Sequence, residues 1–161
     1  MPFSHPIEVR FGDLDAMGHV NNAMIVTYLE QGRFQWWRSY LGGRKFQEEG
    51  FLLARVELDY RMPILLGDDV RVELHCTRVG NSSFELSYRV TKGLGGELFA
   101  EGKSVQVMLD FATNRAKPLS PVTREWLEAQ SGCCSARRSG RRVGACDRPW
   151  SPGWRLAARR T

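Results

Sequence analysis

The chain has few cysteines, and it has no apolar stretch long enough to cross a membrane. Three of its four cysteines, Cys133, Cys134 and Cys146, lie beyond residue 130, which leaves Cys76 alone in the preceding part. This distribution does not indicate a disulfide framework. Residues 1–30 also lack the basic region and apolar run of a secretory signal. We therefore expect a cytoplasmic protein with no membrane partner.

A surplus of positive charge is absent from most of the chain, although the formal net charge is +5. Residues 131–161 hold eight of the 23 basic residues and one of the 18 acidic residues, which leaves 15 basic and 17 acidic residues in residues 1–130. A nucleic-acid-binding surface needs a concentration of Lys and Arg that this larger part lacks. We therefore predict no nucleic-acid partner.

The end of the chain also lacks the residues that build a core. Residues 131–161 contain no Ile, Phe, Tyr, Met, Lys or Glu and show neither helical nor strand periodicity. We predict one domain over residues 1–130 and a disordered Arg-rich tail over residues 131–161. The tail is either an extension not selected for folding or an arm for nucleic acid or anionic membrane. Its scattered Arg residues, without an amphipathic pattern, favour the first hypothesis.

One long helix is predicted over residues 22–41. This segment contains no proline, begins with asparagine and is followed by two glycines, which are typical helix boundaries. Its apolar residues fall on nearly every face, as in a helix that is buried on several sides. Gly32, in its interior, either weakens the helix or lets another backbone approach closely.

Alternation of apolar and polar residues predicts one strand before this helix and four after it. The predicted strands cover residues 7–11, 54–61, 70–77, 84–91 and 98–111, and a closing helix is predicted over 123–130. Short connections between the last four strands predict antiparallel neighbours. The expected fold is α+β, with an antiparallel sheet of about five strands wrapped around one long central helix. Because one sheet leaves part of an all-round apolar helix exposed, a partner subunit is also expected.

The densest run of chemically distinctive residues, 11–23, connects the first strand to the helix and contains Asp13 and Asp15. A helix start presents unpaired amide N–H groups that stabilise developing negative charge. A carbonyl group held there gains an oxyanion hole, and a nearby carboxylate can attack it or activate water. This position therefore suits carbonyl chemistry.

The run FGDLDAMGHVNNAMIVTYLEQGR, residues 11–33, resembles the signature of the 4-hydroxybenzoyl-CoA thioesterase-like family of hot-dog proteins. The DYRMP segment at 59–63 and the Gly67-Asp68 pair also match, and the resemblance covers residues 5–130. It implies the hot-dog fold and hydrolysis of an acyl-CoA or aroyl-CoA thioester to free acid and coenzyme A. It further implies a homodimer or homotetramer and no cofactor, with coenzyme A present only as part of the substrate.

The resemblance also implies roles for individual residues. Asp15 corresponds to the catalytic carboxylate, as nucleophile or general base, and Asn22 to the residue whose main-chain N–H polarises the thioester carbonyl. For Asp15 by itself, a turn-forming role is the alternative. Gly18, His19 and Tyr28 are the predicted substrate-binding residues.

Each predicted binding residue has a structural alternative. Gly18 supplies either a special backbone conformation or close substrate approach. His19 contacts the substrate or orders the loop, and Tyr28 borders an acyl pocket or packs in the core. Asp13 is expected to hold the loop through hydrogen bonds.

Another branch of hot-dog thioesterases places its carboxylate on the central helix, which makes Glu30 a reserve candidate. A salt bridge with Arg33 is the preferred interpretation of Glu30. The histidines have no metal-ligand spacing, so no metal is predicted. Two other functions remain open: an acyl-CoA-binding module without catalysis, and hydrolysis of acyl-carrier-protein thioesters.

Overall fold

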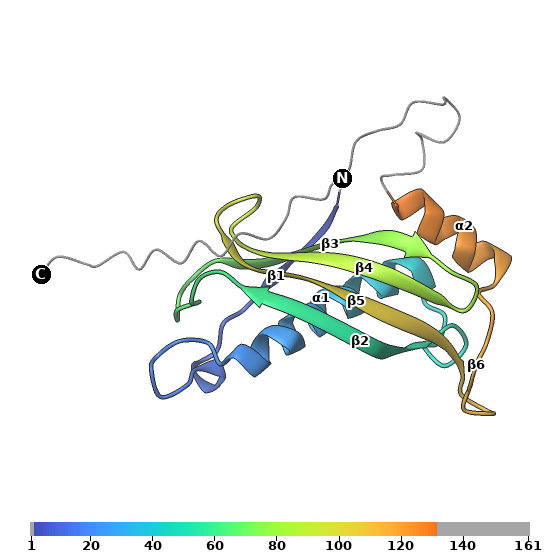
Figure 1. The fold of residues 1–161 in the computed structure, drawn as a ribbon, viewed down its shortest axis with the longest axis horizontal. Coiled ribbons are helices and arrows are strands. Elements are labelled where there is room, and N and C mark those ends of the chain that lie inside the picture. The colour runs from blue at the N-terminus through green and yellow to red at the C-terminus, as the bar shows by residue number, and fades with distance from the viewer. Residues whose placement is uncertain (1, 132–161) are drawn as a thin grey trace, which may run out of the picture.

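The computed structural model describes residues 2–131, so all of the predicted tail except Ser131 lies outside the described residues. One strand precedes a long helix, and four long strands, a short strand and a second helix follow it (Figure 1). The elements are β1 (Phe3–Ile7), a 3₁₀ helix (Phe11–Asp13), α1 (Asn22–Leu41), β2 (Phe51–Tyr60), β3 (Val70–Val79), β4 (Ser83–Lys92), β5 (Leu98–Asp110), β6 (Arg115–Ala116) and α2 (Pro121–Gln130).

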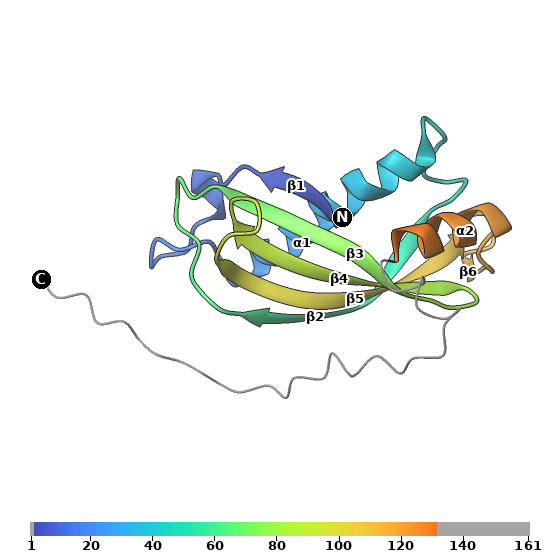
Figure 2. The same cartoon turned by 90° about the horizontal axis from the view of Figure 1, so that it is seen from above.

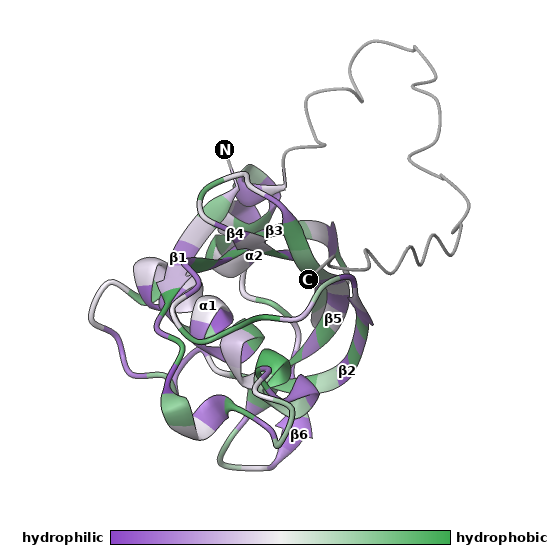
Figure 3. Cartoon of the chain, turned by 90° about the vertical axis from the view of Figure 1, so that its left-hand side faces the viewer, coloured by the Kyte–Doolittle hydropathy of each residue, from purple (hydrophilic) through white to green (hydrophobic). Residues whose placement is uncertain are grey.

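The strands form one antiparallel sheet in the order β1-β3-β4-β5-β2, and β6 pairs with β5. The sheet curves around α1 (Figures 2 and 3), which confirms the predicted α+β hot-dog architecture. The sequence predicts that strands adjacent in the chain pair with each other, and this prediction is wrong for β2. This strand pairs with β5 and lies at an edge of the sheet, because residues 61–69 carry the chain across to β3.

The first strand lies four residues earlier than the alternation predicts. Phe3–Ile7 pairs with β3, from Phe3 opposite Leu74 to Ile7 opposite Val70. The chain then turns at Phe11–Asp13, because the Asp13 carboxylate accepts a hydrogen bond from the Arg10 amide at 3.0 Å. The alternation of Ile7, Val9 and Phe11 therefore does not correspond to a strand.

Helix α1 has the predicted bounds and is capped at both ends. The Asn21 side chain accepts from the Ala23 amide at 2.9 Å, and Gly42 ends the helix with φ +56°. Gly32 faces β3, where a Cβ atom would lie 2.7 Å from Val72 Cγ1. The glycine thus lets the helix lie close against the sheet.

Aromatic rings fill the core between α1 and the sheet. Trp37 stacks on Phe84 with ring centroids 5.5 Å apart, and Trp36 contacts Trp126 of α2 at 4.8 Å. Cys76 is buried on β3. The same core explains why α1 carries apolar residues on several faces. None of the helices within residues 2–131 is long and apolar enough to span a membrane.

Candidate active site

A tightly folded loop connects the 3₁₀ helix to α1. The Asp15 amide donates to the His19 carbonyl oxygen at 2.8 Å, and the Gly18 amide donates to the Asp15 carbonyl oxygen at 3.0 Å. Gly18 has φ +76°, in the region that glycine adopts without strain, and nothing lies within 4 Å of the place of a Cβ atom. The backbone conformation, rather than lack of space, therefore requires glycine here.

Asp15 lies on this loop with an exposed side chain. Its Oδ1 accepts hydrogen bonds from the Met17 amide at 2.8 Å and the His19 amide at 3.3 Å. One oxygen therefore fixes the orientation of the carboxylate, and the other, Oδ2, has no donor among the described residues.

Asp13, two residues earlier, is in the opposite situation. Its side chain is 2% exposed, and both of its oxygens accept hydrogen bonds. Oδ1 accepts from Arg10 Nη2 at 2.9 Å, and Oδ2 accepts from the Arg10 amide and from the Tyr28 hydroxyl at 2.8 Å. These bonds confirm that Asp13 holds the loop.

The electrostatics of Asp13 follow from these contacts. Burial alone raises the pKa of the Asp13 carboxyl, but the hydrogen bonds from Arg10 and Tyr28 outweigh it and lower the pKa below 3.8. Burial, followed by the bond to Asp13, raises the pKa of the Tyr28 hydroxyl. At neutral pH the pair is therefore a carboxylate and a neutral phenol that donates to it.

Asn22 is the first residue of α1, after the cap residue Asn21. Its amide N–H has no acceptor among residues 2–131, as expected for the first turn of a helix. Its carbonyl oxygen accepts from the Tyr60 hydroxyl at 3.0 Å, which ties the helix start to the end of β2. The helix start therefore combines a fixed position with an available donor.

The structure brings Asp15, Gly18 and His19 together on one loop directly before Asn22. The main chain of His19 stabilises this loop: its amide donates to Asp15 Oδ1, and it forms an isolated antiparallel β-bridge with Leu65. Tyr28 has no exposed surface and lies under the loop, against Asp13. Substrate contact by Gly18, His19 and Tyr28 remains a prediction.

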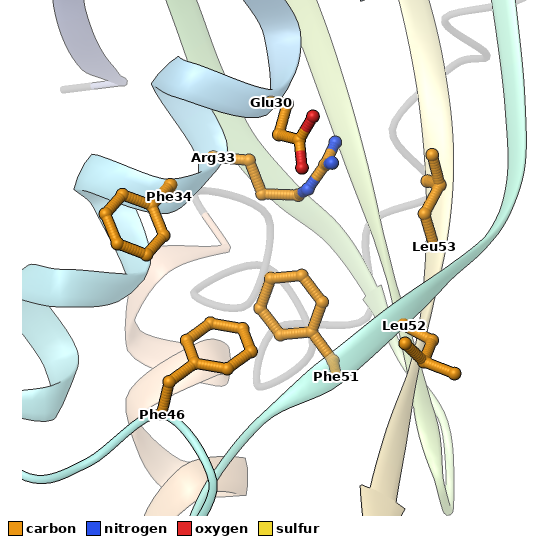
Figure 4. A pocket seen from close by; sticks show the side chains of 7 residues that line it. All are labelled: Glu30, Arg33, Phe34, Phe46, Phe51, Leu52 and Leu53. Atoms are coloured by element: carbon orange, nitrogen blue, oxygen red, sulfur yellow. The ribbon is translucent and has the colours of Figure 1, made fainter. Parts of the chain in front are cut away.

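A cavity of about 220 Å³ lies farther along α1, between this helix and the start of β2 (Figure 4). Glu30 and Arg33 line it together with Phe34, Phe46, Phe51, Leu52 and Leu53. The predicted salt bridge between Glu30 and Arg33 is not formed. Arg33 is 6% exposed, and its Nη1 instead donates to the Tyr88 hydroxyl at 3.3 Å.

Sequence reasoning missed Arg10 and Tyr60 as supports of the loop and helix start. Their partners, Asp13 and Asn22, were recognised, but Tyr60 is 38 residues away from Asn22 in the chain. The only signal for Tyr60 was its position in the DYRMP segment. Within residues 2–131, no cluster of three or more His, Cys, Asp or Glu side chains is arranged to hold a metal ion.

Comparison with known proteins identifies related sequences and structures. The sequence profile of a family described as the thioesterase-like superfamily matches residues 9–127. The long-chain acyl-CoA thioesterase FadM of Escherichia coli K12 is 28% identical over 131 residues, which cover 76% of this chain and 94% of FadM. The 1,4-dihydroxy-2-naphthoyl-CoA hydrolase of Synechococcus elongatus is 26% identical over 126 residues, with coverages of 74% and 90%.

A similar solved structure is a thioesterase from Thermus thermophilus in complex with coenzyme A and Zn. It is 37% identical to this chain, with a TM-score of 0.68, and the match covers 80% of this chain and 94% of that one. Sequence and structure comparisons therefore agree on the same kind of protein, and the family profile ends at residue 127.

Proposed function

The chain belongs to the thioesterase-like superfamily, and from that premise we propose that it hydrolyses an acyl-CoA or aroyl-CoA thioester to the free acid and coenzyme A. The observation that carries this proposal is the contrast between two neighbouring carboxylates. Asp13 is buried and fully hydrogen-bonded, whereas Asp15, on the loop that leads into α1, has no donor to its Oδ2 among the described residues.

Asp15 supplies the carboxylate for the reaction by one of two routes. In the first, Oδ2 attacks the thioester carbonyl carbon, coenzyme A leaves as its thiolate, and water hydrolyses the resulting mixed anhydride. In the second, Oδ2 takes a proton from a water molecule that attacks the carbonyl carbon directly. Either route consumes one water and needs no bound cofactor.

The helix start supplies the electrostatic part of catalysis. The free N–H of Asn22 donates to the thioester carbonyl oxygen as negative charge develops on it, and the positive end of the α1 dipole acts in the same direction. Tyr60 supports this role because its hydroxyl bonds the Asn22 carbonyl oxygen and so ties the first residue of α1 to β2. Asn22 thus acts through its backbone, and its side chain is dispensable.

The test is turnover by Asp15→Asn. We expect the variant to keep its fold, measured by circular dichroism, and to lose roughly 10²–10⁴-fold in kcat. Asp69→Asn is the matched control because Asp69 is another exposed aspartate, and we expect it to keep wild-type turnover. Near wild-type hydrolysis by Asp15→Asn would exclude Asp15 from the mechanism.

A panel of thioesters separates this proposal from its alternatives. Tight binding of acyl-CoA without release of thiol would indicate a binding module. Release of thiol only from acyl-carrier-protein thioesters would indicate the carrier-protein enzyme.

We also propose that two chains associate through β2. This edge strand is ten residues long and leaves Leu52 50% exposed and Val56 37% exposed. A long edge strand that carries exposed apolar side chains is a pairing surface. Two copies related by a two-fold axis would pair their β2 strands antiparallel and cover these side chains. A tetramer of such dimers and a cytoplasmic location remain predictions.

Val56→Lys tests the dimer because it places a charge at the centre of β2. We expect a folded protein of half the wild-type mass by light scattering. His75→Lys, at an exposed position of the interior strand β3, is the control and should keep the wild-type mass. A Val56→Lys protein with unchanged mass would place the interface elsewhere.

A further inference from the structure

The loop that carries Asp15 is bonded to the connection between β2 and β3. The Val20 amide donates to the Ile64 carbonyl oxygen at 2.9 Å. His19 forms an antiparallel β-bridge with Leu65, the next residue of that connection. His19 is in turn bonded to Asp15 twice, because its amide donates to Oδ1 and its carbonyl oxygen accepts from the Asp15 amide. A displacement of the connection would therefore move a donor that orients the Asp15 carboxylate.

Asp68 holds the main chain of Leu65 at two points. The Leu65 amide donates to Asp68 Oδ2 at 2.9 Å, and the Leu65 carbonyl oxygen accepts from the Asp68 amide at 3.2 Å. Gly67 lies between them with φ +89°, a conformation that glycine adopts without strain and that closes the turn. The Leu65 side chain is 42% exposed, so burial contributes little to its position. The buried Ile64 fixes one side of Leu65, and Asp68 fixes the other.

The other oxygen of Asp68 bonds to the sheet. Oδ1 accepts from Lys92 Nζ at 3.0 Å, and Lys92 lies at the end of β4 opposite Val70, where β3 begins. The Asp68 side chain is 13% exposed. Burial alone raises the pKa of its carboxyl, but the bonds from the Leu65 amide and from Lys92 outweigh it and lower the pKa below 3.8. At neutral pH Asp68 is therefore a carboxylate that ties Leu65 to the end of β4.

These contacts lie at one end of the molecule. Figures 1 and 2 show the loop before α1, the connection from β2 to β3 and the turn after β4 at the same end of the sheet. Strand β3 pairs with both β1 and β4, which makes it the fixed part of this arrangement. The Asp68 carboxylate joins the start of β3 to Leu65, and the main chain of Leu65 joins it to the Asp15 loop. The orientation of Asp15 is therefore linked to the sheet through Asp68.

We propose that Asp68 is a positioning residue for thioester hydrolysis, which acts on Asp15 through Leu65 and His19. The inference rests on the proposed function and deepens it by adding a residue from outside the strand-to-helix loop. Attack by a carboxylate, or proton transfer to it, requires the carboxylate to be held in one orientation. Loss of Asp68 should therefore slow the chemical step and leave substrate binding unchanged.

Steady-state kinetics of Asp68→Ala test this role. We expect kcat to fall roughly 10- to 100-fold and KM to stay within about twofold of wild type, because a misplaced carboxylate slows the reaction of a substrate that still binds. Asp68→Asn keeps an acceptor for the Leu65 amide and loses the charge that pairs with Lys92, so its kcat should lie between those of wild type and Asp68→Ala. Asp68→Asn also gives the same measurements if Asp68→Ala does not fold.

Lys92→Met tests the link to the sheet. It removes the partner of Asp68 Oδ1 and keeps the bond to Leu65, so kcat should fall less than in Asp68→Ala. In the Asp68→Ala background, Lys92→Met should change kcat by no more than about twofold, because the interaction is already lost. A full additional loss in the double variant would mean that Lys92 acts independently of Asp68.

Asp110→Ala is the matched control. The Asp110 carboxylate also closes a turn, since its Oδ1 accepts from the Ala112 amide at 2.9 Å and from the Thr113 amide at 3.4 Å. That turn joins β5 to β6, at the opposite end of the sheet from the Asp15 loop (Figure 1). Asp110→Ala should lower the unfolding temperature and keep the wild-type kcat. An equal loss of kcat in Asp110→Ala would assign the effect of Asp68→Ala to a general loss of stability.

Hydrogen exchange measures the link from Asp68 to the loop without relying on catalysis. The amides of His19 and Val20 bond to Asp15 and to Ile64, so their exchange rates report how firmly the loop is held. We expect both amides to exchange several-fold faster in Asp68→Ala than in wild type, and at the wild-type rate in Asp110→Ala.

Two results would overturn the positioning role. One is a kcat of folded Asp68→Ala within about twofold of wild type. The other is a fall in kcat without faster exchange of the His19 and Val20 amides, which would mean that Asp68 affects the reaction by another route. If these amides exchange faster in Asp68→Ala but wild type hydrolyses no thioester, the proposed function fails and the link between Asp68 and the loop stands.

Discussion

Asp13 and Asp15 are separated by one residue, yet they differ in burial and in hydrogen bonding. Asp13 has donors at both oxygens, and Asp15 has donors at only one. The sequence could place both in the loop, but the choice of Asp15 came from resemblance to a family. The contact of Asp13 with Tyr28 spans 15 residues and depends on how the loop lies over α1, which local patterns do not determine.

Tyr28 is predicted to position the loop that carries Asp15. Tyr28→Phe removes the hydroxyl that donates to Asp13, so we expect a fall of roughly 1.5–3 kcal/mol in the free energy of unfolding. We also expect kcat to fall about 10-fold with little change in KM, because a looser loop misplaces Asp15. Urea denaturation and steady-state kinetics measure these changes.

Tyr40→Phe is the matched control for this prediction. The Tyr40 hydroxyl bonds to Thr123 at 2.8 Å, near the opposite end of α1. Its loss should lower stability and leave kcat unchanged. If the two variants have the same kcat, Tyr28 contributes only to stability.

The lowered pKa of Asp13 predicts how stability depends on pH. A carboxyl whose pKa is below 3.8 in the folded state stabilises the protein above that pH, and the stabilisation is lost as the pH falls through the folded pKa. We expect the stability difference between wild type and Asp13→Asn to be constant at neutral pH and to shrink below 3.8. Urea denaturation over this pH range measures it, and a difference that grows on acidification would contradict the assigned hydrogen bonds.

At the scale of elements, the packing of α1 on β3 depends on Gly32. Gly32→Ala should lower the free energy of unfolding by about 1–2 kcal/mol, since steric overlap with Val72 exceeds the gain in helix propensity. Thermal unfolding measures this loss. Gln31→Ala, at the exposed neighbouring position, is the control and should change stability by less than about 0.5 kcal/mol. A stabilised Gly32→Ala protein would mean that Val72 can shift at little cost in free energy.

Local sequence patterns predict an element correctly where capping residues mark its ends. Helix α1 was found within its observed bounds because glycines and asparagines mark its ends. Strand β1 was misplaced because its pairing with β3 is non-local and because Asp13 closes a turn over an apparent alternation. The pairing of β2 with β5 also depends on a crossing connection that no local pattern specifies.

At the scale of the whole chain, the excess of basic residues and the thioesterase-like domain lie in different segments. Residues 1–130 contain 15 basic and 17 acidic residues, so the high isoelectric point comes from the segment that follows. We predict that deletion of residues 132–161 leaves thioester hydrolysis within about twofold of wild type, since small changes far from a site have small effects. Assay of the purified truncated protein measures this. A large loss of activity or of folded protein would assign the segment a role.

In that truncated protein, the reactivity of the buried Cys76 thiol reports local unfolding of the sheet. Without residues 132–161, Cys76 is the single thiol of the chain. Burial on β3 raises the pKa of Cys76 to about 11, so the folded protein holds a shielded, protonated thiol at neutral pH. Alkylation then proceeds only through molecules in which β3 has separated from its neighbours. The labelling rate therefore measures how often the middle of the sheet opens under native conditions.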